Sequence, residues 1–180
     1  MEPQMQITKP SDIGLWIDKY DDIFSDFDPR PYSERALSDD FLNEARKASR
    51  DKVCGQIELK FMIAEKERDL KLESQIKKRL RNHFMRHHQC LVKDQQKMAR
   101  DGRNLLVLGI VIMLCATYLN YNFQAKSLLV SFILVIFEPA GWFLFWSGGD
   151  RMLFEPKKYA PELEFYEKMS KSDISFVSLN

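Results

Sequence analysis

The sequence predicts a mainly α-helical membrane protein, in which a two-span transmembrane helical hairpin is joined to a cytosolic α+β domain with a long juxtamembrane helix and a small sheet. Two apolar runs, residues 105–119 and 128–146, approach the length of about 20 residues that crosses a bilayer core. The second run is interrupted only by Glu138. Two such runs in tandem are unusual for the core helices of a soluble domain, and the rest of the chain is strongly charged.

The residues that flank the two runs predict the orientation of the hairpin. Tyr118, Tyr121 and Phe123 suit one aromatic belt at a membrane interface, and Trp142 and Trp146 suit the other. The connector has one lysine, whereas several bases precede the first run and follow the second: Lys93, Lys97, Arg100, Arg103, Arg151, Lys157 and Lys158. The positive-inside rule therefore predicts cytoplasmic termini. The expected parts are a cytosolic domain over 1–103, a transmembrane hairpin over 104–147 and a cytosolic tail over 148–180.

Shorter elements are expected in the cytosolic part. Ser11 can cap a helix with Ile13, Ile17, Tyr20 and Phe24 on one face, ended by the prolines of "DPRP". Ser38 suits the start of a second helix, to about Lys52. Alternating apolar residues predict a strand near 56–63 and another in the tail, "SDISFVSL". We expect these two strands to pair, so that the tail folds back on the N-terminal domain.

A long basic helix is expected over about 65–103, leading directly into the first span with Gly102 as a local weak point. If unbroken it is close to 60 Å long. Ile76, Leu80, Phe84 and Leu91 form a narrow apolar stripe on it. Such a stripe usually packs against partners, which makes self-assembly a reasonable expectation.

Charge and cysteine usage restrict the class of protein further. Residues 11–40 carry nine acids against three bases, and residues 41–103 carry nine acids against seventeen bases. The basic part can meet phosphate, lipid headgroups or the chain's own acidic segment. Cys54, Cys90 and Cys115 are scattered singly, which is typical of a reducing compartment, and no cleavable signal peptide is apparent.

The stretch "RLRNHFMRHHQC", residues 79–90, holds all three histidines and allows three interpretations. Arg81 with His87 or His88 resembles the arginine–histidine pattern of HEPN ribonucleases, in which histidine would handle a proton and arginine would hold phosphate. His83 and His87, four residues apart, have a spacing that can bind zinc, with Cys90 as a third ligand, but no second ligand cluster supports it. The third interpretation is structural: a basic helix face that lines a vestibule, an interface or anionic lipid.

Glu138 and Pro139 form the other unusual pair, because a charge and a helix breaker adjoin within a membrane span. Intramembrane acids usually face a bundle interior or a watery pathway. Two spans cannot enclose such a route, whereas several hairpins in a ring can. The alternative is a protonated Glu138 that donates a hydrogen bond to Thr117, Asn120 or a backbone carbonyl within one hairpin.

This layout, with "RNHFMRH" at residues 81–87, resembles the small membrane accessory proteins found beside the RNA-targeting effector of type VI-B CRISPR systems. The stretches "YDDIFSDFDPRPYSERALSDDFL" and "KKYAPELEFYEKMSKSDISF" also resemble a wider group of two-span bacterial proteins of unknown role. The first resemblance implies an oligomeric pore of the bacterial inner membrane that depolarises the cell in antiphage defence. Arg81, Asn82 and His87 would then be the HEPN-like positions, and the protein would need them for its function although it does not cut RNA. The motif departs from the family pattern in continuing a juxtamembrane helix.

The functional hypothesis is a non-enzymatic homo-oligomeric pore that meets membrane lipid, needs no cofactor and acts with an RNA-guided effector. A membrane-anchored HEPN-like ribonuclease and a passive adaptor acting through the acidic segment remain the alternatives. Direct RNA binding by the basic helix stays open.

Overall fold

The computed structural model describes residues 12–50, 57–123 and 128–179. They are mostly helical and carry one small sheet. The described residues up to Gln89 and from Glu162 onward form one compact unit, here called the sheet unit. Those between Cys90 and Pro161 form a second, here called the hairpin unit.

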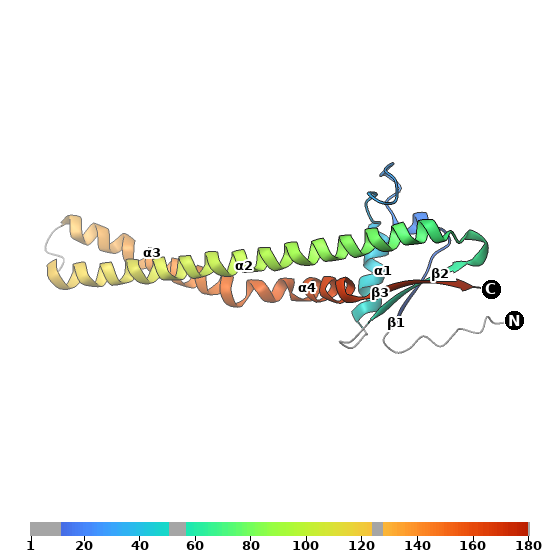
Figure 1. The fold of residues 1–180 in the computed structure, drawn as a ribbon. Coiled ribbons are helices and arrows are strands. Elements are labelled where there is room, and N and C mark those ends of the chain that lie inside the picture. The colour runs from blue at the N-terminus through green and yellow to red at the C-terminus, as the bar shows by residue number, and fades with distance from the viewer. Residues whose placement is uncertain (1–11, 51–56, 124–127, 180) are drawn as a thin grey trace. The chain divides into compact units, whose positions relative to one another are not determined.

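The sheet has three parallel strands in the order β1–β2–β3, namely Asp12–Trp16, Glu58–Ala64 and Asp173–Leu179 (Figure 1). Leu59 pairs with Ile174 and Phe61 with Phe176, so the expected pairing of the tail with the central strand is confirmed. Parallel neighbours need long crossover connections. Helix α1, Asp39–Arg50, lies in the first crossover, and the second contains the hairpin itself.

The sequence-based prediction was wrong at the first element. Residues 12–16 form a strand rather than a helix, and only Tyr20–Ile23 make a short 3-10 helix, η1. Ile13 is buried, while its neighbour Gly14 is exposed, as in a strand with one buried face. The helical spacing of the apolar residues was misleading, because Ile17 reaches the same core from the connection after β1 and Tyr20 from the start of η1.

The core of the sheet unit lies between the sheet and the helices. Leu59, Phe61 and Ile63 of β2 are fully buried, and the ring centroids of Phe61 and Phe176 are 5.1 Å apart. Three helices add further buried side chains: Phe41 and Ala45 of α1, Ile76, Leu80 and Phe84 of α2, and Phe165, Tyr166 and Met169 of α4. Each large apolar side chain buried in this way contributes about 1.5–3 kcal/mol.

Three of the four residues of the predicted apolar stripe, Ile76, Leu80 and Phe84, are therefore buried within their own unit. Burial of these residues removes the stripe as an argument for self-assembly, which stays a prediction. The narrow stripe is explained by the small three-stranded sheet that the helix has to cover.

Helix α2 spans Leu70–Phe123, so the basic helix does continue without a break into the first apolar run. A short 3-10 helix, η2, Glu65–Glu67, precedes it. Asp69 caps its start, since Oδ1 accepts hydrogen bonds from the backbone N–H groups of Lys71 and Leu72.

A buried polar cluster fixes the same end of α2. Glu73 is 3% exposed and accepts hydrogen bonds from Arg68 Nε at 2.8 Å and from the Tyr20 hydroxyl at 3.1 Å. The Tyr20 oxygen accepts the backbone N–H of Asp69, and Arg68 also donates to Ser178 Oγ at 2.8 Å. One carboxylate thus ties η1, the start of α2 and the last strand together.

In the hairpin unit, α2 runs antiparallel to α3, Leu128–Leu153, with glycines at the contact. A Cβ added to Gly109 would lie 2.7 Å from the carbonyl oxygen of Gly141, and one added to Gly148 would lie 2.6 Å from that of Gly102. Both helices repeat this contact every seven residues, the period of left-handed antiparallel packing. Ala116 and Leu134, one heptad further along, are buried too.

Helix α4, Glu155–Lys171, returns the chain to β3. Only its last ten residues belong to the sheet unit, where Phe165, Tyr166 and Met169 are buried. The predicted connector of the hairpin includes residues 124–127, which lie outside the described residues.

Candidate functional site

Helices α2 and α3 are both long and apolar enough to cross a membrane. In each, only 11% of the most apolar 18-residue window is buried, whereas the core helix of a soluble protein is mostly buried. The exposed side chains include Val111, Leu114, Phe132 and Val135, and also Trp142 and Trp146 at 56% each. This surface suits a hydrocarbon environment better than water.

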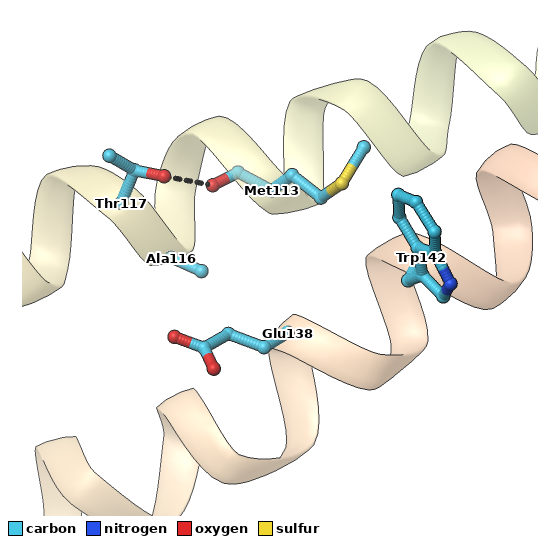
Figure 2. A pocket seen from close by; sticks show the side chains of 5 residues that line it. All are labelled: Met113, Ala116, Thr117, Glu138 and Trp142. Atoms are coloured by element: carbon cyan, nitrogen blue, oxygen red, sulfur yellow. Dashed lines mark hydrogen bonds between the residues drawn. The ribbon is translucent and has the colours of Figure 1, made fainter.

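Glu138 lies within this apolar surface. It is ten residues into α3, about 15 Å from the helix start at 1.5 Å per residue, so it is close to mid-span. Its side chain is exposed at an open groove of about 340 Å³, whose other lining residues are Met113, Ala116, Thr117 and Trp142 (Figure 2). The lining combines apolar side chains with the hydroxyl group of Thr117 and the carboxyl group of Glu138.

The carboxyl group of Glu138 has no hydrogen bond or ion pair among the residues that the structure describes. The sequence suggested Thr117 as a hydrogen-bond partner of Glu138. Its hydroxyl group instead donates from Oγ1 to the carbonyl oxygen of Met113 at 2.9 Å, as the dashed line in Figure 2 shows. The expected alternative, in which Thr117 or Asn120 satisfies Glu138 within one hairpin, is therefore not observed in the described residues.

Pro139 lies inside α3, which continues to Leu153. Proline has no backbone N–H, so it cannot donate to the carbonyl of Val135 one turn earlier. Glu138 and this carbonyl place two polar groups within one turn of each other in the apolar run of α3.

The histidines of the "RNHFMRHH" stretch lie in the sheet unit. The ring of His87 stacks on Tyr166 of α4, with centroids 5.2 Å apart and planes at 15°, and His83 lies 4.2 Å from His87. Burial, followed by repulsion from His87 and Arg79, lowers the pKa of His83 to about 4. His83 is therefore neutral at pH 7, and these two rings join α2 to α4 by packing.

Arg81 and His87 are not brought together. They are six residues apart on one helix, which points their side chains in directions about 120° apart around the helix axis. Arg81 Nη2 lies 3.6 Å from Asp173 Oδ1, at the start of β3, and both side chains are more than half exposed. Asn82 is exposed and His88 partly so. A phosphate held by Arg81 would not be beside the ring of His87.

No metal site is found in the described part of the chain, where no three His, Cys, Asp or Glu side chains gather. Cys90, the third ligand of the zinc interpretation, is exposed and free. The His83–His87 pair thus lacks further ligands among the described residues.

The acidic N-terminal segment binds its own arginines. Asp28 accepts hydrogen bonds from Arg30 Nη2 at 2.7 Å and from the backbone N–H of Ala36 at 2.7 Å. The Arg30 guanidinium above all, and then that N–H, hold the pKa of Asp28 well below its usual range. Arg35 contacts Asp21 at 2.7 Å. Part of the charge that suggested an adaptor surface is therefore used within the segment.

Two groups of residues were missed by reasoning from the sequence. The four glycines of the hairpin contact could have been found from their spacing. Gly102 and Gly109 on α2 are seven residues apart, as are Gly141 and Gly148 on α3, and all lie within or beside an apolar run. The Arg68–Glu73–Tyr20 cluster carries none, because its members resemble any charged or aromatic residue of the segment.

Comparison with known proteins finds no family model, no curated protein and no solved structure that matches this chain.

Proposed function

We propose that the protein is a membrane pore: α2 and α3 cross the bilayer as a hairpin, and several hairpins surround an ion pathway that Glu138 lines. The observation that supports this proposal is the carboxyl group of Glu138, exposed near mid-span without a partner in the described residues. A charged group at the bilayer centre costs on the order of 3 kcal/mol or more, so it needs water or a partner.

Self-association supplies both. A single hairpin has two helices, which cannot enclose water, and the groove that Glu138 lines is open. When copies associate around an axis with their grooves inward, each Glu138 leaves lipid for a shared polar interior. The apolar remainder of the hairpin surface then faces lipid, as its composition requires.

A ring of carboxylates favours cations over anions. Among the described residues between Arg103 and Asp150, Glu138 is the one Asp, Glu, Lys or Arg. We therefore expect the pore to conduct K⁺ more readily than Cl⁻ despite the bases near its cytosolic end.

The biological setting of the proposal comes from the resemblance to the accessory proteins of type VI-B CRISPR systems. It implies the bacterial inner membrane and a gate opened when the RNA-guided effector meets phage RNA. No comparison supports this link, so the trigger stays a prediction. The ribonuclease alternative loses one of its two histidines, because Arg81 and His87 point apart and His87 packs on Tyr166. His88 is seven residues from Arg81 on the same face of α2, so the pair Arg81–His88 stays the form in which this alternative can be tested.

The test is conductance of the purified protein in a planar bilayer under a KCl gradient, together with its molar mass in detergent. We expect an oligomer with discrete conductance steps and a reversal potential towards that of K⁺. Glu138→Gln should lower the K⁺ preference. Cys115→Ser is the matched control, because Cys115 is exposed on the same stretch of α2 but does not line the groove.

A monomer that inserts into bilayers and conducts nothing would contradict the proposal. Equal effects of Glu138→Gln and Cys115→Ser on a real conductance would contradict the role of Glu138 alone.

A further inference from the structure

The bases at one end of the hairpin unit form a surface that the proposed pore does not use. Arg100 and Arg103 of α2 and Arg151 of α3 are exposed. None of the three has an ion pair among the residues that the structure describes, although Asp101 and Asp150 are their immediate neighbours in sequence. Three unpaired guanidinium groups in one unit leave their hydrogen-bonding capacity to a ligand.

The glycine contact brings the three arginines to one level. A Cβ added to Gly102 would lie 3.0 Å from the Cβ of Arg151 and 2.9 Å from the carbonyl oxygen of Gly148. Arg151 therefore begins directly across from Gly102, which Arg103 follows and which Arg100 precedes by two residues. The close approach that glycine allows thus brings bases of both helices to one level along the hairpin, with Arg100 and Arg103 about 60° apart around α2.

The same level is that of lipid headgroups if the hairpin spans the membrane. Arg103 is two residues before the uncharged run 105–119, about 3 Å along the helix, and Arg100 about 8 Å. Arg151 follows Trp146 by five residues, also about 8 Å. The headgroup layer occupies about 5–8 Å on each side of the hydrocarbon core, so the three guanidinium groups can reach it.

We propose that Arg100, Arg103 and Arg151 bind the phosphate of an anionic phospholipid in the leaflet beside the chain termini. Arginine matches this ligand because its planar guanidinium donates two parallel hydrogen bonds to phosphate oxygens. The proposal rests on the membrane insertion included in the proposed function, but not on conductance.

The test is binding of phosphatidylglycerol to the purified full-length protein in detergent. Binding is measured by native mass spectrometry and by the rise in melting temperature that the lipid causes. The variant replaces all three arginines by glutamine. The control replaces three exposed lysines of the sheet unit by glutamine: Lys66, Lys71 and Lys78. It therefore removes the same amount of positive charge from another part of the protein. Phosphatidylcholine and soluble glycerol phosphate serve as comparison ligands.

We expect phosphatidylglycerol to bind the wild type and the control alike. Each base near an anionic surface contributes about fivefold to binding, so the triple glutamine variant should bind at least tenfold more weakly. A triple lysine variant, which keeps the charge, should fall between the two because lysine cannot form the paired contact. It also carries the test if the glutamine variant does not fold.

Equal binding by the variant and the wild type would overturn the proposal, as would equal losses in the variant and the control. Equal binding of phosphatidylcholine, displacement by glycerol phosphate at the same concentration, or displacement by a short RNA would overturn it as well. A protein that a carbonate wash removes from membranes would instead contradict the insertion on which the proposed function depends.

Discussion

Gly148 and Gly102 face each other across the hairpin at a distance that only glycine permits, since a Cβ on Gly148 would lie 2.6 Å from the Gly102 carbonyl oxygen and 2.5 Å from the backbone nitrogen of Leu106. Both obstacles are backbone atoms, which cannot rotate away as a flexible side chain can. The two helices must separate to admit even a methyl group.

Gly148→Ala is therefore expected to destabilise the hairpin, by about 1–3 kcal/mol as overpacking usually does. The measurement is the temperature at which half of the protein, purified in detergent, remains soluble and helical. Gly149→Ala is the matched control, because a Cβ on Gly149 meets nothing within 4 Å. Alanine should even stabilise that position slightly, by about 0.5–1 kcal/mol. Equal melting of the two variants would refute the close contact.

The same contact illustrates what could be predicted from the sequence. Two apolar runs, the second interrupted only by Glu138, were enough to predict the helical hairpin, because bilayer thickness sets the length of a helical span. The contact between the two helices was not predicted, since each glycine taken singly indicates flexibility. Only the antiparallel register, which pairs Gly102 with Gly148 and Gly109 with Gly141, reveals their common role.

The sheet unit shows a different limit. Alternation in β2 and in the tail predicted two strands that pair. The edge strand β1 was mistaken for a helix, because five residues are too few to distinguish the two periods and Ile17 and Tyr20 happen to continue the helical one. Glu138 could be recognised from its span alone, but whether a partner satisfies it depends on side-chain geometry that spacing does not contain.

Arg68→Ala should destabilise the sheet unit severely. It would leave Glu73, which is 3% exposed, without the guanidinium that donates to both of its oxygens. Removing one partner of a buried ion pair typically costs about 3–5 kcal/mol. The measurement is hydrogen–deuterium exchange of peptides that cover β2, in which the variant should exchange much faster than the wild type.

The control for this loss is Lys47→Ala, which breaks an exposed ion pair with Glu44 on α1. Exposed pairs contribute about 1 kcal/mol at most, so exchange in β2 should hardly change. If Arg68→Ala behaves like Lys47→Ala, the polar cluster does not hold the sheet to α2.

The orientation of the hairpin can be tested with reporter fusions in bacteria. Alkaline phosphatase needs disulfides and is active only outside the cytosol. We expect activity when it is inserted in the connector after Phe123 and none when it is fused to the C-terminus, because the bases lie at the ends of the hairpin nearer the termini. Fusions that give the reverse pattern would place the termini outside and contradict the predicted topology.

A pH-dependent loss of stability is expected from His83, which lies between His87 and Phe84 on α2 and near Tyr166 of α4. Its pKa is about 4 in the fold, against 6.5 for an ordinary histidine. Between these values the unfolded chain binds more protons than the folded one, so stability falls as the pH falls from 6.5 to 4. At pH 5 the loss relative to pH 7.5 should be about 2 kcal/mol.

Hydrogen–deuterium exchange of β2 at pH 5 and pH 7.5, corrected for the intrinsic rates, measures this difference. Carboxylates with a lowered pKa, such as Asp28 and Glu167, lose their contribution only below about pH 4 and do not interfere. His83→Phe keeps an aromatic ring at the contact but cannot be protonated, so its two exchange rates should converge. His88→Gln, which changes a histidine outside this ring cluster, should retain the wild-type dependence. If the pH dependence of exchange survives in His83→Phe and disappears in His88→Gln, His88 is the titrating group and His83 is excluded.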